Sequence, residues 1–157
     1  MGVMADGRRS VEVAAPKFTG ISHLDLSVSD LEASTDWYLR TLGLRELHRG
    51  EFETRSVVVL YAREARLVIG LNQHKGRPEG RFDERRVGLD HVGFSVETRE
   101  ELDVWEEHLA SLGVEHSPVA DVDSGAALVF RDPDNIQLEI WWTRPRPKPQ
   151  GGEPASS

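Results

Sequence analysis

The chain contains no cysteine. This absence excludes disulfide bonds, thiolate metal ligands and a thiol nucleophile. The sequence also lacks an apolar run close to the ~20 residues that a membrane-spanning helix needs. Residues 1–15 are polar and charged, without the apolar centre of a secretory signal. We therefore expect a soluble cytoplasmic protein that does not associate with a membrane.

Basic residues are few relative to acidic ones. The chain has 19 Lys and Arg against 27 Asp and Glu, a net charge of −8. Because proteins that bind nucleic acids carry an excess of positive charge on the contacting surface, we expect no nucleic-acid partner. A length of 157 residues suits one domain or two fused half-domains. Such a chain can bury a core without disulfides.

What the sequence does contain is a repeat. Segments 21–28 and 89–96 both alternate apolar with polar residues and carry a histidine near the start, His23 and His91. Each segment leads into a region with apolar residues at helical spacing. The expected capping boxes and glycine stops of the two helices are Ser29-x-x-Glu32 with Gly43 and Thr98-x-x-Glu101 with Gly113.

After each predicted helix the apolar period changes from about 3.6 to about 2. The expected strands are 20–28, 44–49, 56–62 and 67–71 in the first unit, and 89–96, 114–118, 126–130 and 136–142 in the second. The sequence therefore predicts an α+β fold in which two paired βαβββ modules form a curved mixed sheet around a concave site. The expected organisation is a leader (1–16), a first module (17–72), a linker (73–88), a second module (89–143) and a disordered tail (144–157).

Strand alternation assigns side chains to faces. His23, His91 and Glu139 fall on the faces opposite the helices. A carboxylate in the middle of an apolar strand is costly unless something pairs with it. A single strand histidine is more often a core residue than a ligand, but two at equivalent repeat positions with an inward glutamate favour a metal. We predict a divalent ion held by His23, His91 and Glu139, an arrangement that leaves coordination positions open.

The same alternation places further candidates around this site. Asp25 and Trp141 face the cavity and are candidate substrate contacts, whereas Trp142 is expected in the core. His74 and Tyr61 are the candidate catalytic acid–base groups, although His74 also suits a plain linker residue. His108 falls on the polar side of the second helix and is expected to be solvated.

Four sequence motifs stand out: His23-x-x-x-x-Val28-Ser29-Asp30-Leu31, Trp37-Tyr38-x-x-Thr41-Leu42-Gly43-Leu44, Leu89-Asp90-His91-Val92-Gly93-Phe94 and Phe130-Arg131-Asp132-Pro133-Asp134-Asn135-Ile136-Gln137-Leu138-Glu139. Together they resemble the vicinal oxygen chelate superfamily, which includes glyoxalase I, extradiol dioxygenases, fosfomycin-modifying enzymes and bleomycin-binding proteins. The resemblance covers about 18–143 and identifies the superfamily rather than one activity.

The resemblance implies a metal site with ligand positions on four strands. Three positions match His23, His91 and Glu139, and the fourth falls at or near Gly70, which cannot bind a metal. This implies a three-ligand centre for Fe(II) or Mn(II), with Zn(II), Co(II) or Ni(II) as alternatives. A small substrate would chelate the ion through two neighbouring oxygens. The resemblance also implies a homodimer, and if the modules are exchanged between chains, the two histidines of one chain serve different sites.

Three functions remain open on the sequence. The first is a metalloenzyme of dioxygenase, lyase or transferase type, which the His-His-Glu set favours. The second is a metal-free protein of the bleomycin-resistance type that sequesters an aromatic or cationic small molecule, which the net charge of −8 and Trp141 suit. The third is a degenerate member that retains the site without turnover.

Overall fold

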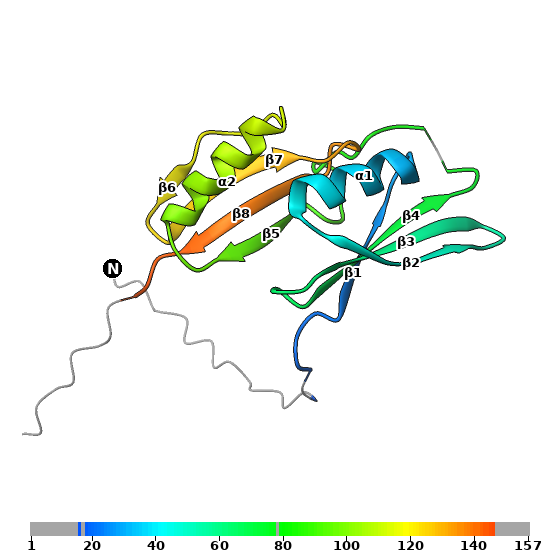
Figure 1. Cartoon of the computed structure of the whole chain (residues 1–157), viewed down its shortest axis with the longest axis horizontal. Helices are drawn as coiled ribbons and strands as arrows, with labels where there is room; N and C mark the ends of the chain where they lie inside the picture. Colours follow the sequence, from blue (N-terminus) through cyan, green and yellow to red (C-terminus); the bar gives the residue numbers. More distant parts are fainter. Residues whose placement is uncertain (1–15, 17, 78, 147–157) are drawn as a thin grey trace, which may run out of the picture.

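The computed structural model describes residues 16, 18–77 and 79–146. These residues form two modules of the same plan (Figure 1). The first module contains β1 (His23–Ser27), α1 (Leu31–Leu42), β2 (Arg45–Glu51), β3 (Arg55–Ala62) and β4 (Leu67–His74). The second contains β5 (His91–Val96), α2 (Glu100–Ser111), β6 (Ala120–Val122), β7 (Gly125–Arg131) and β8 (Gln137–Thr143). The predicted α+β class and paired βαβββ modules are confirmed, whereas most of the predicted leader and tail lies outside the described residues.

Each module has its own mixed sheet. Within the described residues the strand orders are β1-β4-β3-β2 and β5-β8-β7-β6, and no strand pairs across the modules. In both sheets the first strand pairs in parallel with the last, and the remaining pairs are antiparallel. One chain therefore presents two separate curved surfaces where we expected a continuous one.

The helix boundaries agree with the predicted signals except at the two N-caps. The N-cap of α1 is Asp30, whose carboxylate accepts a hydrogen bond from the Ala33 backbone N–H at 3.0 Å, so the cap predicted at Ser29 is one residue early. The N-cap of α2 is Arg99, whose side chain makes no capping hydrogen bond, so the cap predicted at Thr98 is also one residue early. The Glu101 carboxylate still accepts from the Thr98 backbone N–H at 2.8 Å. Gly43 and Gly113 have φ values of 63° and 68°, and both end their helices in the left-handed conformation.

One strand lies further along the chain than predicted. The strand expected at 114–118 is replaced by β6 at Ala120–Val122, which pairs with β7. Pro118 has no backbone N–H to donate to a neighbouring strand. Upstream of it, only an isolated bridge joins His116 to Phe130.

Strand β4 is longer than predicted. It continues from the expected end at residue 71 to His74, because its last three residues pair with the first residues of β3. His74 lies opposite Arg55 in this register. His74 is therefore a strand residue, and its interpretation as part of the linker was wrong.

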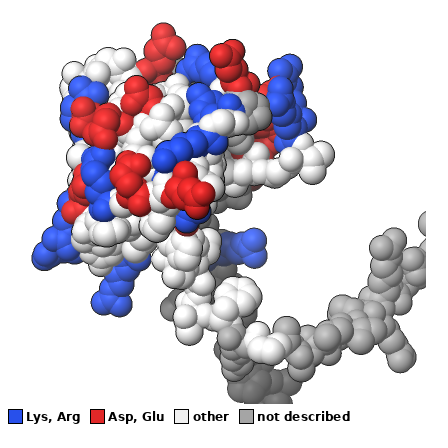
Figure 2. All heavy atoms as spheres, turned by 90° about the vertical axis from the view of Figure 1, so that its right-hand side faces the viewer, with Lys and Arg blue, Asp and Glu red and all other residues white. Residues whose placement is uncertain are grey.

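The helices cover one side of each sheet. Helix α1 contacts β3 and β4, α2 contacts β7 and β8, and both lie on the upper side in Figure 1. Leu26, Val28, Leu138 and Ile140 lie on the helix side of their sheets, and each is exposed by 4% or less. Val92, Phe94 and Val96 of β5 are only partly buried against the core. Neither described helix has the length and apolar character to span a membrane. On the face shown in Figure 2, acidic and basic described side chains are interspersed.

Polar contacts fix the joint between the modules. The Tyr38 hydroxyl donates to Asp132 Oδ2 at 3.0 Å, and the Ser29 backbone N–H donates to Asp134 Oδ2 at 2.8 Å. Burial raises the pKa of Asp132 to about 6, against the opposing effect of the hydrogen bonds that its carboxylate accepts. Burial, followed by the nearby charge of Asp132, also raises the pKa of Tyr38.

Two further contacts join the modules. His108 Nε2 donates to the carbonyl of Thr41 at 3.0 Å, so His108 is not the solvated residue that we expected. The rings of Trp37 and Phe130 stack with centroids 6.2 Å apart. Together with the buried carboxylates, these contacts make one continuous core from both modules.

Candidate metal centre

The sheet face of the second module that points away from α2 carries a histidine and a glutamate side by side. His91 Nε2 lies 3.9 Å from Glu139 Oε2. The Nδ1 atom of His91 is 2.5 Å from Asp90 Oδ1, a hydrogen bond that orients the ring with Nε2 toward Glu139. Glu139 lies opposite Gly93 in the parallel register, and a Cβ there would be 3.9 Å from Glu139 Oε1. The structure thus brings two of the three predicted ligands together.

His23 belongs to a different pair. Its Nε2 atom lies 3.3 Å from Asp25 Oδ2, and its Nδ1 atom is 3.2 Å from the Ser22 hydroxyl. The side chains of His23 and Asp25 are 60% and 50% exposed on the open face of the first sheet. Among the described residues, no three His, Asp or Glu side chains come close enough to hold a metal ion. The predicted triad is therefore not assembled within one chain.

Asp25 occupies the space beside Gly70, the position where the family resemblance places a fourth ligand. The two residues are direct partners in the parallel register of β1 and β4. A Cβ at Gly70 would overlap Asp25 Oδ1 and come within 2.9 Å of Asp25 Cγ. The Asn72 side-chain amide donates to Asp25 Oδ1 at 2.9 Å. Reasoning from the sequence treated Gly70 as the loss of an acid and missed that a neighbouring strand places an acid there.

The two candidate acid–base residues lie on the same sheet face as His23. The register aligns His23 with Val68 and Val68 with Tyr61 across three strands. The Arg45 guanidinium lies over the Tyr61 ring, 5.3 Å from its centroid. His74 reaches this face from the far end of β4, beside Asn72 and Ser27. Tyr61 and His74 therefore share the open face of the first sheet with His23.

A small cavity of about 280 Å³ adjoins Asp25 on this face. Ser27, Arg55, Asn72 and His74 also line it. Arg55 Nε is buried without a hydrogen-bond partner, and its guanidinium packs over an aromatic ring. A guanidinium with an unused donor suits an anionic group on a small molecule. Sequence reasoning missed Arg55, because nothing in a basic residue at the start of a strand distinguishes it from a solvated one.

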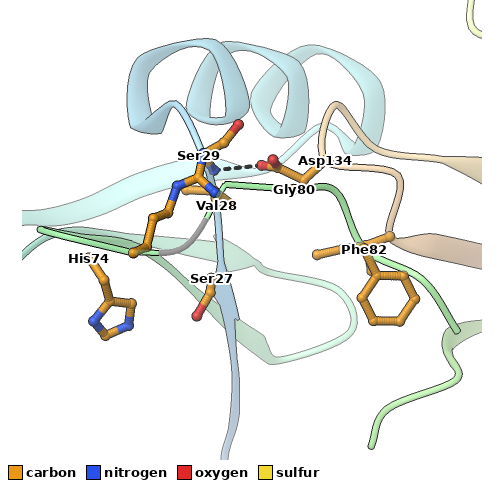
Figure 3. A pocket seen from close by; sticks show the side chains of 9 residues that line it. Ser27, Val28, Ser29, His74, Gly80, Phe82 and Asp134 are labelled. Carbon is orange, nitrogen blue, oxygen red and sulfur yellow. Dashed lines mark hydrogen bonds between the residues drawn. The ribbon is translucent and has the colours of Figure 1, made fainter. Parts of the chain in front are cut away.

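A second cavity of about 420 Å³ continues from the first. Ser27 and His74 line both, and their side chains extend to the same side in Figure 3. Gly80 and Phe82 from the connection between the modules also line the second cavity, and Phe82 lies across from His74 in Figure 3. The hydrogen bond from the Ser29 backbone N–H to Asp134 is drawn beside Gly80. The mixture of apolar wall and few polar groups is typical of small-molecule sites.

The paired tryptophans lie on opposite faces of β8. Trp141 lies on the Glu139 face of β8, and its indole N–H donates to Thr143 Oγ1 at 2.8 Å. Trp142 packs against the core. Trp141 therefore shares a sheet face with the His91–Glu139 pair.

Residues 20–140 match the Glyoxalase/Bleomycin resistance protein/Dioxygenase superfamily. The chain belongs to this family. The resemblance to vicinal oxygen chelate proteins that the sequence motifs suggested is thus confirmed.

Individual relatives support the same assignment. A crystal structure of a glyoxylase/bleomycin resistance protein/dioxygenase domain from Frankia sp. EAN1pec is 42% identical, with a TM-score of 0.76 over 82% of this chain and 100% of that chain. Metallothiol transferase FosB of Staphylococcus epidermidis is 23% identical over 126 residues, 79% of this chain and 82% of FosB. The fosfomycin resistance protein FosX of Listeria monocytogenes, in a mutant form complexed with Mn(II) and 1S,2S-dihydroxypropylphosphonic acid, is 24% identical, with a TM-score of 0.62 over 82% of this chain and 95% of that chain. FosX therefore shares the fold.

Proposed function

We propose that this protein is a metal-dependent enzyme that holds a divalent ion with His23, His91 and Glu139 and binds a small substrate through two neighbouring oxygens. The observation that carries the proposal is the pair formed by His91 Nε2 and Glu139 Oε2, 3.9 Å apart on an exposed sheet face. An imidazole and a carboxylate converging from two strands, with the far ring nitrogen already hydrogen-bonded, is how proteins orient metal ligands.

The donor set fits a divalent ion. Two imidazoles and a carboxylate suit Fe(II) or Mn(II), and also Zn(II), Co(II) or Ni(II). The Nδ1 atoms of His23 and His91 are engaged by the residues that precede them, which leaves each Nε2 to bind. When bound, the ion would supply Lewis-acid polarisation of a substrate oxygen. The names of FosB, a metallothiol transferase, and of the FosX complex with Mn(II) are consistent with this choice.

We infer that two copies of the chain complete each site. His23 lies on the first sheet and the His91–Glu139 pair on the second, and the two sheets of one chain share no strand pairing within the described residues. A second copy that faces its first module toward this pair would supply the missing imidazole. Two-fold symmetry would then create two identical sites per dimer.

The side chains around the ligands would bind and orient the substrate. Arg55, with its buried unpartnered Nε, would hold an anionic group, and Trp141 would stack against an apolar part. His74 and Tyr61 are two groups on the His23 face that could move a proton. The substrate class that follows is a small anion with adjacent oxygens.

Metal titration tests the proposal. Protein stripped with a chelator is titrated calorimetrically with Mn(II), Fe(II), Co(II), Ni(II) and Zn(II). We expect about one ion per chain for a symmetric dimer, and at least a tenfold loss of affinity in His91→Ala and Glu139→Gln. Glu107→Gln, at an exposed glutamate of α2, is the matched control and should bind as the unmodified protein does.

Two outcomes would contradict the proposal. The first is an unmodified protein that takes up none of these ions, which would favour the metal-free sequestering function. The second is undiminished binding in His91→Ala and Glu139→Gln, which would place any metal elsewhere in the protein.

A further inference from the structure

We propose that Asp25 supplies a fourth ligand to the ion, so that each module contributes one imidazole and one carboxylate. This inference rests on the proposed metal-dependent function and extends it. The half-site of the first module is His23 with Asp25, and that of the second is His91 with Glu139.

The two half-sites have the same layout on their sheets. In the second module, Gly93 lies two residues after His91 on β5 and pairs with Glu139 of β8. In the first module, Asp25 lies two residues after His23 on β1 and pairs with Gly70 of β4. The carboxylate is on the last strand of the second module but on the first strand of the first module. In both modules the carboxylate residue pairs with a glycine of the neighbouring strand, and this pair lies two residues beyond the pair that contains the histidine.

The distances within each half-site suit two ligands of one ion. His23 Nε2 is 3.3 Å from Asp25 Oδ2, and His91 Nε2 is 3.9 Å from Glu139 Oε2. Ligand atoms about 2.1 Å from an ion lie roughly 3.0–3.4 Å apart in octahedral or tetrahedral coordination. The pair that contains Asp25 is therefore already at ligand spacing, and the pair that contains Glu139 needs a small adjustment.

The surroundings of Asp25 hold its carboxylate in this position. The buried Asn72 amide donates to Oδ1, which leaves Oδ2 directed at His23 Nε2. Gly70 provides the necessary space, because any side chain there would overlap Oδ1. An exposed aspartate that served only solubility would need neither a buried amide partner nor a glycine beside it.

The fourth ligand changes what the ion can accept. Four protein ligands leave two positions of an octahedral ion open. Two positions are the number that chelation through neighbouring oxygens requires. The three-ligand centre expected from the sequence becomes a four-ligand centre in which Asp25 replaces the acid that Gly70 cannot provide.

Two matched pairs of variants test the role of Asp25 by Mn(II) calorimetry. Asp25→Asn should lower the affinity for Mn(II) at least tenfold, whereas Asp36→Asn, at an exposed aspartate of α1, should not change it. Gly70→Ala should also weaken binding, because its Cβ displaces the carboxylate. Gly93→Ala is its control, since a Cβ there would be 3.9 Å from Glu139 Oε1, an ordinary contact. Urea unfolding of each variant establishes that the fold is retained.

The visible absorption spectrum of Co(II)-loaded protein separates a ligand from a positioning residue. Loss of a ligand should change the absorption of Co(II) in Asp25→Asn, whereas Asp36→Asn should match the unmodified protein. Weaker binding with an unchanged spectrum would mean that Asp25 only orients His23, and would overturn the inference.

Normal Mn(II) binding in Asp25→Asn and Gly70→Ala, with loss in His91→Ala, would also overturn the inference while leaving the proposed function intact. If the unmodified protein bound none of the five divalent ions titrated above, both the inference and the proposed function would be wrong.

Discussion

The buried carboxylate of Asp132 should make the stability of this protein depend on pH. Asp132 is 3% exposed at the joint between the modules, and burial raises its pKa from 3.8 to about 6. A carboxyl group whose pKa is higher in the folded than in the unfolded state binds its proton more tightly when folded. Its stabilising contribution is therefore complete below about pH 3.8 and is lost as the pH rises through about 6.

The size of the effect follows from the two pKa values. Between about pH 7.5 and pH 5, protonation of Asp132 should add roughly 1.4 kcal/mol to the free energy of unfolding. Asp132→Asn cannot ionise, but its amide oxygen can still accept from the backbone N–H groups of Asp134 and Ile136. The stability of the unmodified protein relative to Asp132→Asn should therefore increase by that amount over this pH range.

Urea unfolding at several pH values measures this difference. Asp36→Asn, at an exposed position, is the control and should follow the unmodified protein at every pH. Comparing variants removes the contribution of other carboxylates, such as Asp83 and Glu84, whose pKa values are lowered by their arginine partners. A constant difference between the unmodified protein and Asp132→Asn from about pH 7.5 to pH 5 would refute the reasoning.

Two further substitutions test the packing between and within the modules. Tyr38→Phe removes the hydroxyl that donates to Asp132 Oδ2 and should lower the free energy of unfolding by about 1–3 kcal/mol, measured in urea at neutral pH; an unchanged value would mean that this bond does not hold the modules together. Leu128→Ala, at a fully buried position of β7, should cost about 2–5 kcal/mol. Val104→Ala is its control, because the Val104 side chain is 65% exposed, and its free energy of unfolding should stay within about 0.5 kcal/mol of that of the unmodified protein. Similar losses of stability in Leu128→Ala and Val104→Ala would contradict the assigned core.

The faces of the strands could be predicted from the sequence because alternation is a local property. The positions of His23 and Glu139 on open faces, and of Leu26 and Leu138 under the helices, required only the period of two. The repeat likewise indicated the two modules, because each strand–helix unit carries its own signals.

Contacts between distant residues set the limits of that reasoning. Both Ser29 and Asp30 are good N-cap residues, and the backbone N–H of Ser29 is bonded instead to Asp134 in the other module. The placement of Asp25 over Gly70 depends on the register between β1 and β4, which lie far apart in the sequence. Alternation within strands does not determine how modules or copies of the chain face one another. The separation of His23 from the His91–Glu139 pair therefore entered the sequence analysis only as an alternative that the family resemblance implied.

The most direct test of the central claim is Mn(II) binding by a mixture of two defective variants. His23→Ala and His91→Ala should each lose Mn(II) binding alone. If each site combines His23 of one copy with His91 and Glu139 of another, subunit exchange between the two variants creates dimers with one intact site. An equal mixture should then recover about a quarter of the sites of the unmodified protein. No recovery after confirmed subunit exchange would contradict a site shared between two copies.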